Sequence, residues 1–157
     1  GMTLVRSMTW IIPMQIGAYF GYLSFGFLAD RFGRRRIFAL FLTIAALLVP
    51  IYGQLARSPG VLMLLGPLLG FVGHGYFSLF GAFLAELFPT AVRATGQGLA
   101  YNGGRGLGAL APYSIGVLAT MPRFGIGTAL GLTSAFFLAG ALLMLALPDT
   151  SGKPLED

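Results

Sequence analysis

Polar side chains that could bind a small solute stand inside long apolar runs of the sequence. Arg105 is the first of them, because a guanidinium presents a planar fork of N–H donors that matches a carboxylate. An imidazole can accept and release a proton, so His74 could relay one, although a lone histidine in such a run also serves simply to hydrogen-bond a neighbouring helix. Gln15 and Asn102 add neutral donors and acceptors. The candidate substrate-binding residues are therefore Arg105, Asn102, His74 and Gln15.

The residue types present argue against catalysis and against a metal centre. With no cysteine and a single histidine, the sequence offers no thiolate and no cluster of nitrogen or sulfur ligands. It shows no nucleophile paired with a base and no pair of carboxylates at catalytic spacing. We therefore predict no enzyme, no catalytic residues, no metal site and no cofactor.

A cluster of charge interrupts the apolar sequence at residues 26–36, which read GFLADRFGRRR. Because one aspartate and four arginines cannot stay in hydrocarbon, the cluster marks a membrane boundary. Gly26 and Gly33 are expected to be structural, one allowing close approach and the other a tight turn. We predict that this segment is the turn between two membrane helices.

Acidic residues at the ends of two apolar runs are predicted to pair with arginines. Asp30 ends the first run and Glu86 the third, so each lies at the negative end of a helix dipole and requires a cationic partner. A charge-assisted network on one membrane surface would supply it. The alternative is that the charges only determine topology, because exposed ion pairs contribute little stability. The predicted network contains Asp30, Arg31, Arg34, Arg35, Glu86 and Arg93.

Composition indicates that membrane helices carry these residues. The 157 residues are 56% hydrophobic and 10% charged, with a mean hydropathy of +0.82, which is outside the range of soluble globular domains. Arginines beside the apolar runs account for most of the net charge of +5, so topology explains it without nucleic-acid binding. We predict an all-α membrane protein with five transmembrane helices, at about residues 10–28, 37–52, 61–85, 99–118 and 126–147, and a tail over 148–157.

Glycines and prolines predict how these helices pack and bend. Small residues four apart let two helix backbones approach closely, and two such steps occur, Gly17 with Gly21 and Gly66 with Gly70. Proline removes a backbone donor and bends or interrupts a helix. Bends are expected near Pro13, Pro50, Pro67 and Pro112.

Arg105 is predicted to lie near the middle of the bilayer. A helix that starts at Thr95 and rises 1.5 Å per residue places Arg105 roughly 15 Å along its axis. A charge at that depth costs at least about 2.5 kcal/mol unless it meets water or a partner. Every acid of the sequence is expected at the inner surface, so the counter-charge would be backbone carbonyls, an acid outside this chain or an anionic substrate.

The distribution of arginine and lysine orients the helices. Residues 31–36, Arg93 and Lys153 fall on one side, whereas Arg57 and Arg123 occupy single turns on the other. The positive-inside rule makes the first side cytoplasmic, with the N-terminus outside and the C-terminus inside. Residues 1–8 do not resemble a signal peptide, so we expect a further helix before Gly1.

Three segments together resemble the major facilitator superfamily of transporters. Residues 26–36 match its cytoplasmic loop motif, G-x-L-A-D-R-x-G-R-R-R. Residues 86–96, ELFPTAVRATG, resemble the E-x-x-P-x-x-x-R element of sugar and metabolite porters. Residues 148–157 resemble the P-E-T-x-G-x-x-L-E ending, with Asp149 in place of the usual glutamate. Their order and spacing are those of the second half of such a transporter.

The resemblance implies a fold of two six-helix halves, in which the five predicted helices are the eighth to the twelfth. It implies alternating-access, proton-coupled transport in a bacterial inner membrane, with a cytoplasmic C-terminus. The implied partners are the lipid bilayer, the missing N-terminal half, a small-molecule substrate and protons, without nucleic acid. In this family the acid equivalent to Asp30 also caps a helix of the other half when the cytoplasmic side is closed, so the charge network would act as a gate latch.

The cargo and the activity each have alternatives. Arg105 favours a carboxylate, and residues 102–108 followed by Pro112 resemble the metabolite and aromatic-acid symporters more than the sugar porters. A sugar transporter half stays open, as does a non-transporting membrane module or sensor remnant. The polar groups inside the apolar runs favour transport, whereas the missing helix favours a remnant.

Overall fold

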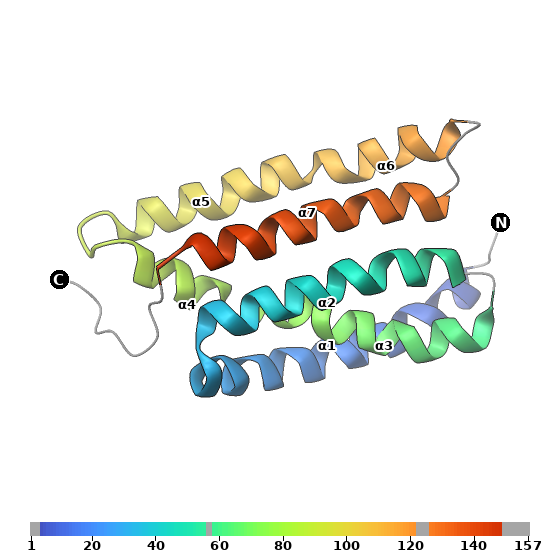
Figure 1. The fold of residues 1–157 in the computed structure, drawn as a ribbon, viewed down its shortest axis with the longest axis horizontal. Coiled ribbons are helices and arrows are strands. Elements are labelled where there is room, and N and C mark those ends of the chain that lie inside the picture. Colours follow the sequence, from blue (N-terminus) through green and yellow to red (C-terminus); the bar gives the residue numbers. More distant parts are fainter. Residues whose placement is uncertain (1–3, 56–57, 122–125, 149–157) are drawn as a thin grey trace.

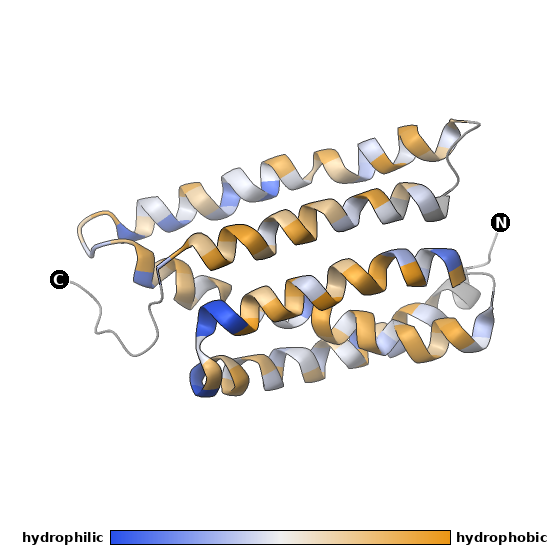
Figure 2. Cartoon of the chain, viewed as in Figure 1, coloured by the Kyte–Doolittle hydropathy of each residue, from blue (hydrophilic) through white to orange (hydrophobic). Residues whose placement is uncertain are grey.

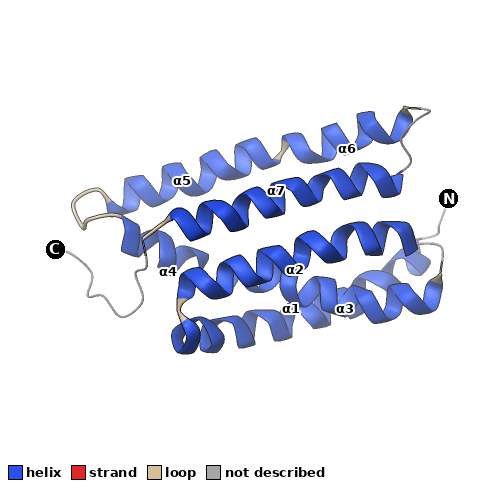
Figure 3. Cartoon of the chain, viewed as in Figure 1, coloured by secondary structure: helices blue, strands red, loops and turns tan. Residues whose placement is uncertain are grey.

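The computed structural model describes residues 4–55, 58–121 and 126–148, and the regular structure of these residues is entirely helical (Figure 3). The predicted all-α membrane fold is confirmed. Figure 1 shows the helices running side by side along one long axis, with α4 continuing α3 and α6 continuing α5. The helices are α1 (Leu4–Phe32), α2 (Arg34–Leu55), α3 (Pro59–Gly75), α4 (Phe77–Leu87), α5 (Arg93–Gly108), α6 (Leu110–Thr120) and α7 (Ile126–Ala146).

The helices extend beyond the first four predicted apolar ranges, whereas α7 matches the fifth range to within one residue. The arginines at 34–36, which were expected in the turn, form the first turn of α2 instead. Arg93, also expected in a turn, is the first residue of α5. Helical hydrogen bonding does not depend on the polarity of side chains, so a helix continues past the end of its hydrophobic stretch. The prediction placed the ends of these helices too far inward.

Among the described residues, three helical stretches are long and apolar enough to cross a membrane. They are Met8–Phe32, Arg34–Leu55 and the combined stretch Pro59–Leu87. The apolar part of α7, Gly131–Ala146, is shorter. Figure 2 shows that hydrophobic residues predominate along α2 and α7, whereas α1 also carries many residues of intermediate hydropathy.

Two helix pairs form the centre of the bundle. α1 packs mainly against α3, and α2 packs mainly against α7 while also touching α1 and α3. Phe25 of α1 is fully buried, and its ring meets those of Phe38 and Phe41 edge-on, with centroids 4.8 and 4.9 Å apart. Edge-to-face aromatic packing therefore joins α1 to α2.

Glycines set the close spacing of α1 and α3. A Cβ atom at Gly17 would overlap the carbonyl oxygen of Pro67, and a Cβ atom at Gly70 would overlap that of Met14. No larger residue fits at either position without moving a backbone. The predicted close approach is confirmed at Gly17, Gly21 and Gly70, whereas a Cβ atom at Gly66 would meet only ordinary contacts.

Gly33 is the single residue between α1 and α2. Its φ of 95° lies in the left-handed region that side chains disfavour, and its N–H donates to the carbonyl of Ala29 at 3.0 Å. The predicted tight turn at Gly33 is confirmed. Gly26 does not allow close approach within the described residues, because a Cβ atom there would have nothing within 4 Å.

Two of the long helical stretches, α3–α4 and α5–α6, are each interrupted by a single residue. Ala109 separates α5 from α6, three residues before Pro112, whose ring excludes the carbonyl of the residue four positions earlier. Tyr76 separates α3 from α4 without a proline nearby, and there the Ser78 hydroxyl donates to the Gly75 carbonyl at 3.0 Å. A side chain that inserts into the hydrogen-bond ladder explains the second interruption. Pro13, Pro50 and Pro67 lie inside continuous helices.

Candidate functional site

Two groups of polar residues stand apart in the bundle. The first is at the end of the molecule where α1 meets α2 and where α4 meets α5, and we call it the charged end (Figure 1). Arg34 forms an ion pair with Glu86 there, and its Nη2 lies 3.6 Å from Asp30 Oδ1. The side chains of Arg34 and Glu86 are 18% and 14% exposed, whereas that of Asp30 is 67% exposed. The structure thus brings together Asp30, Arg34 and Glu86, with Glu86 as the better shielded partner.

The other arginines of the predicted network have different contacts. Arg93 Nε donates to the carbonyls of Ala85 and Phe88 at 2.9 and 3.2 Å, so Arg93 caps the end of α4. Arg35 Nη1 donates to the Leu147 carbonyl at 3.3 Å and caps the end of α7. Arg31 is exposed and lies over the ring of Phe32, 5.6 Å from its centroid. Arg93 and Arg35 therefore connect helix ends at the charged end of the bundle, whereas the contact of Arg31 stays within α1.

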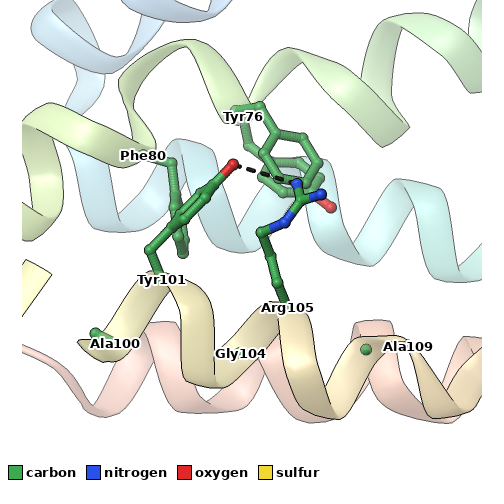
Figure 4. Close-up of a pocket in the computed structure, with 9 residues that line it drawn as sticks. Tyr76, Phe80, Ala100, Tyr101, Gly104, Arg105 and Ala109 are labelled. Carbon is green, nitrogen blue, oxygen red and sulfur yellow. Dashed lines mark hydrogen bonds between the residues drawn. The ribbon is translucent and has the colours of Figure 1, made fainter. Parts of the chain in front are cut away.

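The second group surrounds a cavity of about 580 Å³, which we call the Arg105 hollow. Arg105 and Tyr101 project into it from α5, and Tyr76 and Phe80 face them from the α3–α4 junction (Figure 4). Arg105 Nη1 donates to the Tyr101 hydroxyl at 3.4 Å. The described residues that line the hollow include no acid: they are Tyr76, Phe77, Phe80, Ala100, Tyr101, Gly104, Arg105, Gly108 and Ala109.

The remaining predicted binding residues do not line the Arg105 hollow. Asn102 is exposed on α5, and its Nδ2 donates to the Gly98 carbonyl at 2.8 Å. Gln15 is exposed on α1. His74 is half-buried on α3, and among the described residues its buried Nδ1 has no hydrogen-bond partner. The structure therefore does not gather these three residues with Arg105.

Sequence reasoning missed the aromatic residues of the hollow. Tyr101 precedes Arg105 by four residues, and Tyr76 precedes Phe80 by four, so each pair shares one helix face. That spacing was a usable signal within each helix. The contact between the two pairs depends on the packing of α4 against α5, where Gln97 Nε2 donates to the Gly81 carbonyl at 2.9 Å.

The described residues contain no group of three or more histidine, cysteine or acidic side chains positioned to hold a metal ion. The chemistry available at the Arg105 hollow is instead that of one guanidinium and a set of aromatic rings. These groups are chemically suited to an anion that carries an apolar body.

Comparison with known proteins gives the family context. A model of the Major Facilitator Superfamily matches residues 6–156. The chain is 36% identical to a Cupriavidus pinatubonensis protein named "Probable 4-methylmuconolactone transporter", over 94% of this chain and 34% of that protein. It is 29% identical to the cis,cis-muconate transport protein of Acinetobacter baylyi, over 99% of this chain and 37% of that protein. It is 36% identical to the Escherichia coli inner membrane metabolite transport protein YhjE, over 94% of this chain and 34% of that protein. The chain thus spans about a third of each relative.

Proposed function

The chain belongs to the Major Facilitator Superfamily, and from that premise we propose that it forms part of a transporter that moves a small carboxylate across a membrane by alternating access. The family and the names of its relatives indicate transport and not an enzymatic reaction. In this proposal the helices described here pack against a second set of helices, and the substrate is held between the two sets.

Arg105 is the observation that carries the proposal. It stands twelve residues after the start of α5, roughly 18 Å along the helix at 1.5 Å per residue. It is exposed to the hollow, and no acid among the described lining residues neutralises it. A carboxylate would supply the missing counter-charge through paired N–H···O bonds. The named substrates of two relatives, a muconate and a muconolactone, are consistent with this chemistry.

Uptake by cells that express the complete open reading frame tests the role of Arg105. We expect Arg105→Ala to reduce uptake of a labelled carboxylate such as cis,cis-muconate by roughly ten- to a hundredfold, because a charge-assisted pair contributes roughly 1.5–3 kcal/mol to binding. Leu99→Ala is the matched control, since Leu99 is an exposed residue of α5 that does not line the hollow. Unchanged carboxylate uptake in Arg105→Ala would contradict the proposal, and uptake of sugars alone would favour a sugar transporter.

The charged end is proposed to be the gate latch of the transporter. Arg34, Glu86 and Asp30 join the α1–α2 turn to the end of α4, so separation of these elements must break the ion pairs. The strength of the pairs would then help to set which conformation is populated. We further propose that this end faces the cytoplasm of a bacterial cell.

Proton coupling is proposed to depend on an acid outside the described helices. Asp30 and Glu86, the acids of the described residues, both lie at the charged end. His74 is the alternative candidate for a proton carrier among the described residues. If uptake by His74→Gln no longer depends on pH, His74 is the proton carrier, and the proposal of an acid outside the described helices is wrong.

A further inference from the structure

The Arg105 hollow has an aromatic wall that a carboxylate alone would not require. The rings of Phe80 and Tyr101 lie 6.1 Å apart between α4 and α5, and Tyr76 stacks on Phe77 with centroids 4.7 Å apart. Figure 4 shows the Arg105 guanidinium directed toward Tyr76 and joined to the Tyr101 hydroxyl, with Tyr101 between Arg105 and Phe80. The cavity therefore places one cation beside several π surfaces.

Tyr101 holds the guanidinium in two ways. The hydrogen bond to its hydroxyl, at 3.4 Å, is at the long end of the accepted range, and the guanidinium carbon lies 5.6 Å from the Tyr101 ring centroid, within cation–π distance. A guanidinium has five N–H donors, so this contact leaves others available to a ligand. Restricting a long exposed side chain in advance reduces the entropy lost when a ligand binds.

We propose that Tyr101 is a positioning residue for Arg105, and that Tyr101 and Phe80 together select flat, unsaturated carboxylates over saturated carboxylates of the same size. This inference rests on the proposed function of the Arg105 hollow. An unsaturated acid can lay its π face or edge against the rings while its carboxylate meets the guanidinium. A puckered saturated acid makes fewer contacts with a flat ring.

Paired substrates of equal charge and similar size test the aromatic wall. In the protein expressed from its complete open reading frame, uptake of labelled benzoate is compared with cyclohexanecarboxylate, and cis,cis-muconate with adipate. Phe80→Leu and Tyr101→Leu keep an apolar side chain and remove the ring. We expect each to lower the preference for the unsaturated acid by roughly three- to tenfold, the usual effect of losing one aromatic contact. Phe136→Leu, at an exposed ring of α7 outside the hollow, is the control and should leave the preference unchanged.

Tyr101→Phe separates the hydroxyl from the ring. We expect KM to rise roughly two- to fivefold for all four acids, because the guanidinium loses its acceptor. The maximal rate per transporter and the preference for unsaturated acids should stay as in the wild type. A purely structural role would lower the amount of transporter or its maximal rate without a selective change in KM.

The outcomes distinguish this inference from the proposed function. An unchanged KM in Tyr101→Phe would overturn the positioning role, and an unchanged preference in both leucine variants would overturn the aromatic wall, even if Arg105→Ala abolishes uptake. If the wild-type protein takes up none of the four acids, the proposed carboxylate transport itself fails.

Discussion

Arg34 occupies an electrostatically demanding position in the charged end. It is the first residue of α2, where the helix dipole is positive and a cation is unfavourable. Glu86 and Asp30 lie near the negative ends of α4 and α1, where an anion is unfavourable. Each of the three charges interacts unfavourably with the dipole of its own helix, and ion pairing offsets these three unfavourable interactions. The better shielded pair, Arg34 with Glu86, should therefore contribute most.

Removing the Glu86 charge should loosen the proposed latch. We expect Glu86→Gln to raise severalfold the rate at which a maleimide labels a cysteine placed at Gly104 in the hollow. Asp30→Asn should change that rate less than twofold, because exposed pairs at 3.6 Å are weak. The sequence has no natural cysteine, and a Cβ atom at Gly104 would meet nothing within 4 Å, so the reporter fits.

Arg36→Gln provides the control for the latch. It removes a positive charge from the same end, at an exposed residue outside the Arg34 pair. If the cysteine is labelled at the same rate in Glu86→Gln and in the wild type, the latch proposal is wrong, and the charges serve only to determine the membrane topology. A larger effect of Asp30→Asn than of Glu86→Gln would show that the main partner of Asp30 lies outside this chain.

The pairing of α1 with α3 depends on glycines that cannot be enlarged. Gly70→Ala would push its Cβ atom into the Met14 carbonyl, so we expect a loss of about 1–3 kcal/mol in the free energy of unfolding, as for other overpacked cores. Gly73→Ala, on the same helix, has open space and should be neutral or stabilising by up to about 1 kcal/mol. Thermal unfolding in detergent would measure both, and equal effects of the two variants would contradict the role given to Gly70.

The long helices were predictable because a membrane segment has to be apolar for most of its length. The interruption at Ala109 was also accessible from the sequence, since Pro112 follows it at the spacing that disrupts a helix. The interruption at Tyr76 could not be predicted from the sequence, because it involves a hydrogen bond from Ser78 to Gly75 that no residue pattern indicates. The hollow required contacts between α4 and α5, and the Arg35 cap on α7 joins residues 112 positions apart. Such contacts arise from helix packing and not from local spacing.

Across the whole molecule, positive charge gathers at one end. The α1–α2 turn, the residues between α4 and α5, and the end of α7 lie together there, tied by the Arg34–Glu86 pair and by the Arg35 bond to Leu147 (Figure 1). The opposite end carries the connection from α2 to α3, near Ser58. Arginines favour the cytoplasmic side of a membrane, so this asymmetry predicts the orientation of the entire bundle.

Single cysteines at the two ends test that orientation. Ser58 and Val92 are both exposed and lie at opposite ends of the bundle, which makes Ser58→Cys and Val92→Cys a matched pair. In intact cells, with any cysteine elsewhere in the reading frame replaced, we expect a membrane-impermeant maleimide to label Ser58→Cys at least tenfold faster than Val92→Cys. Permeabilisation should make the two rates similar, because both side chains are accessible to water. The reverse order of labelling in intact cells would place the charged end outside, and the latch would then close the external side of the transporter.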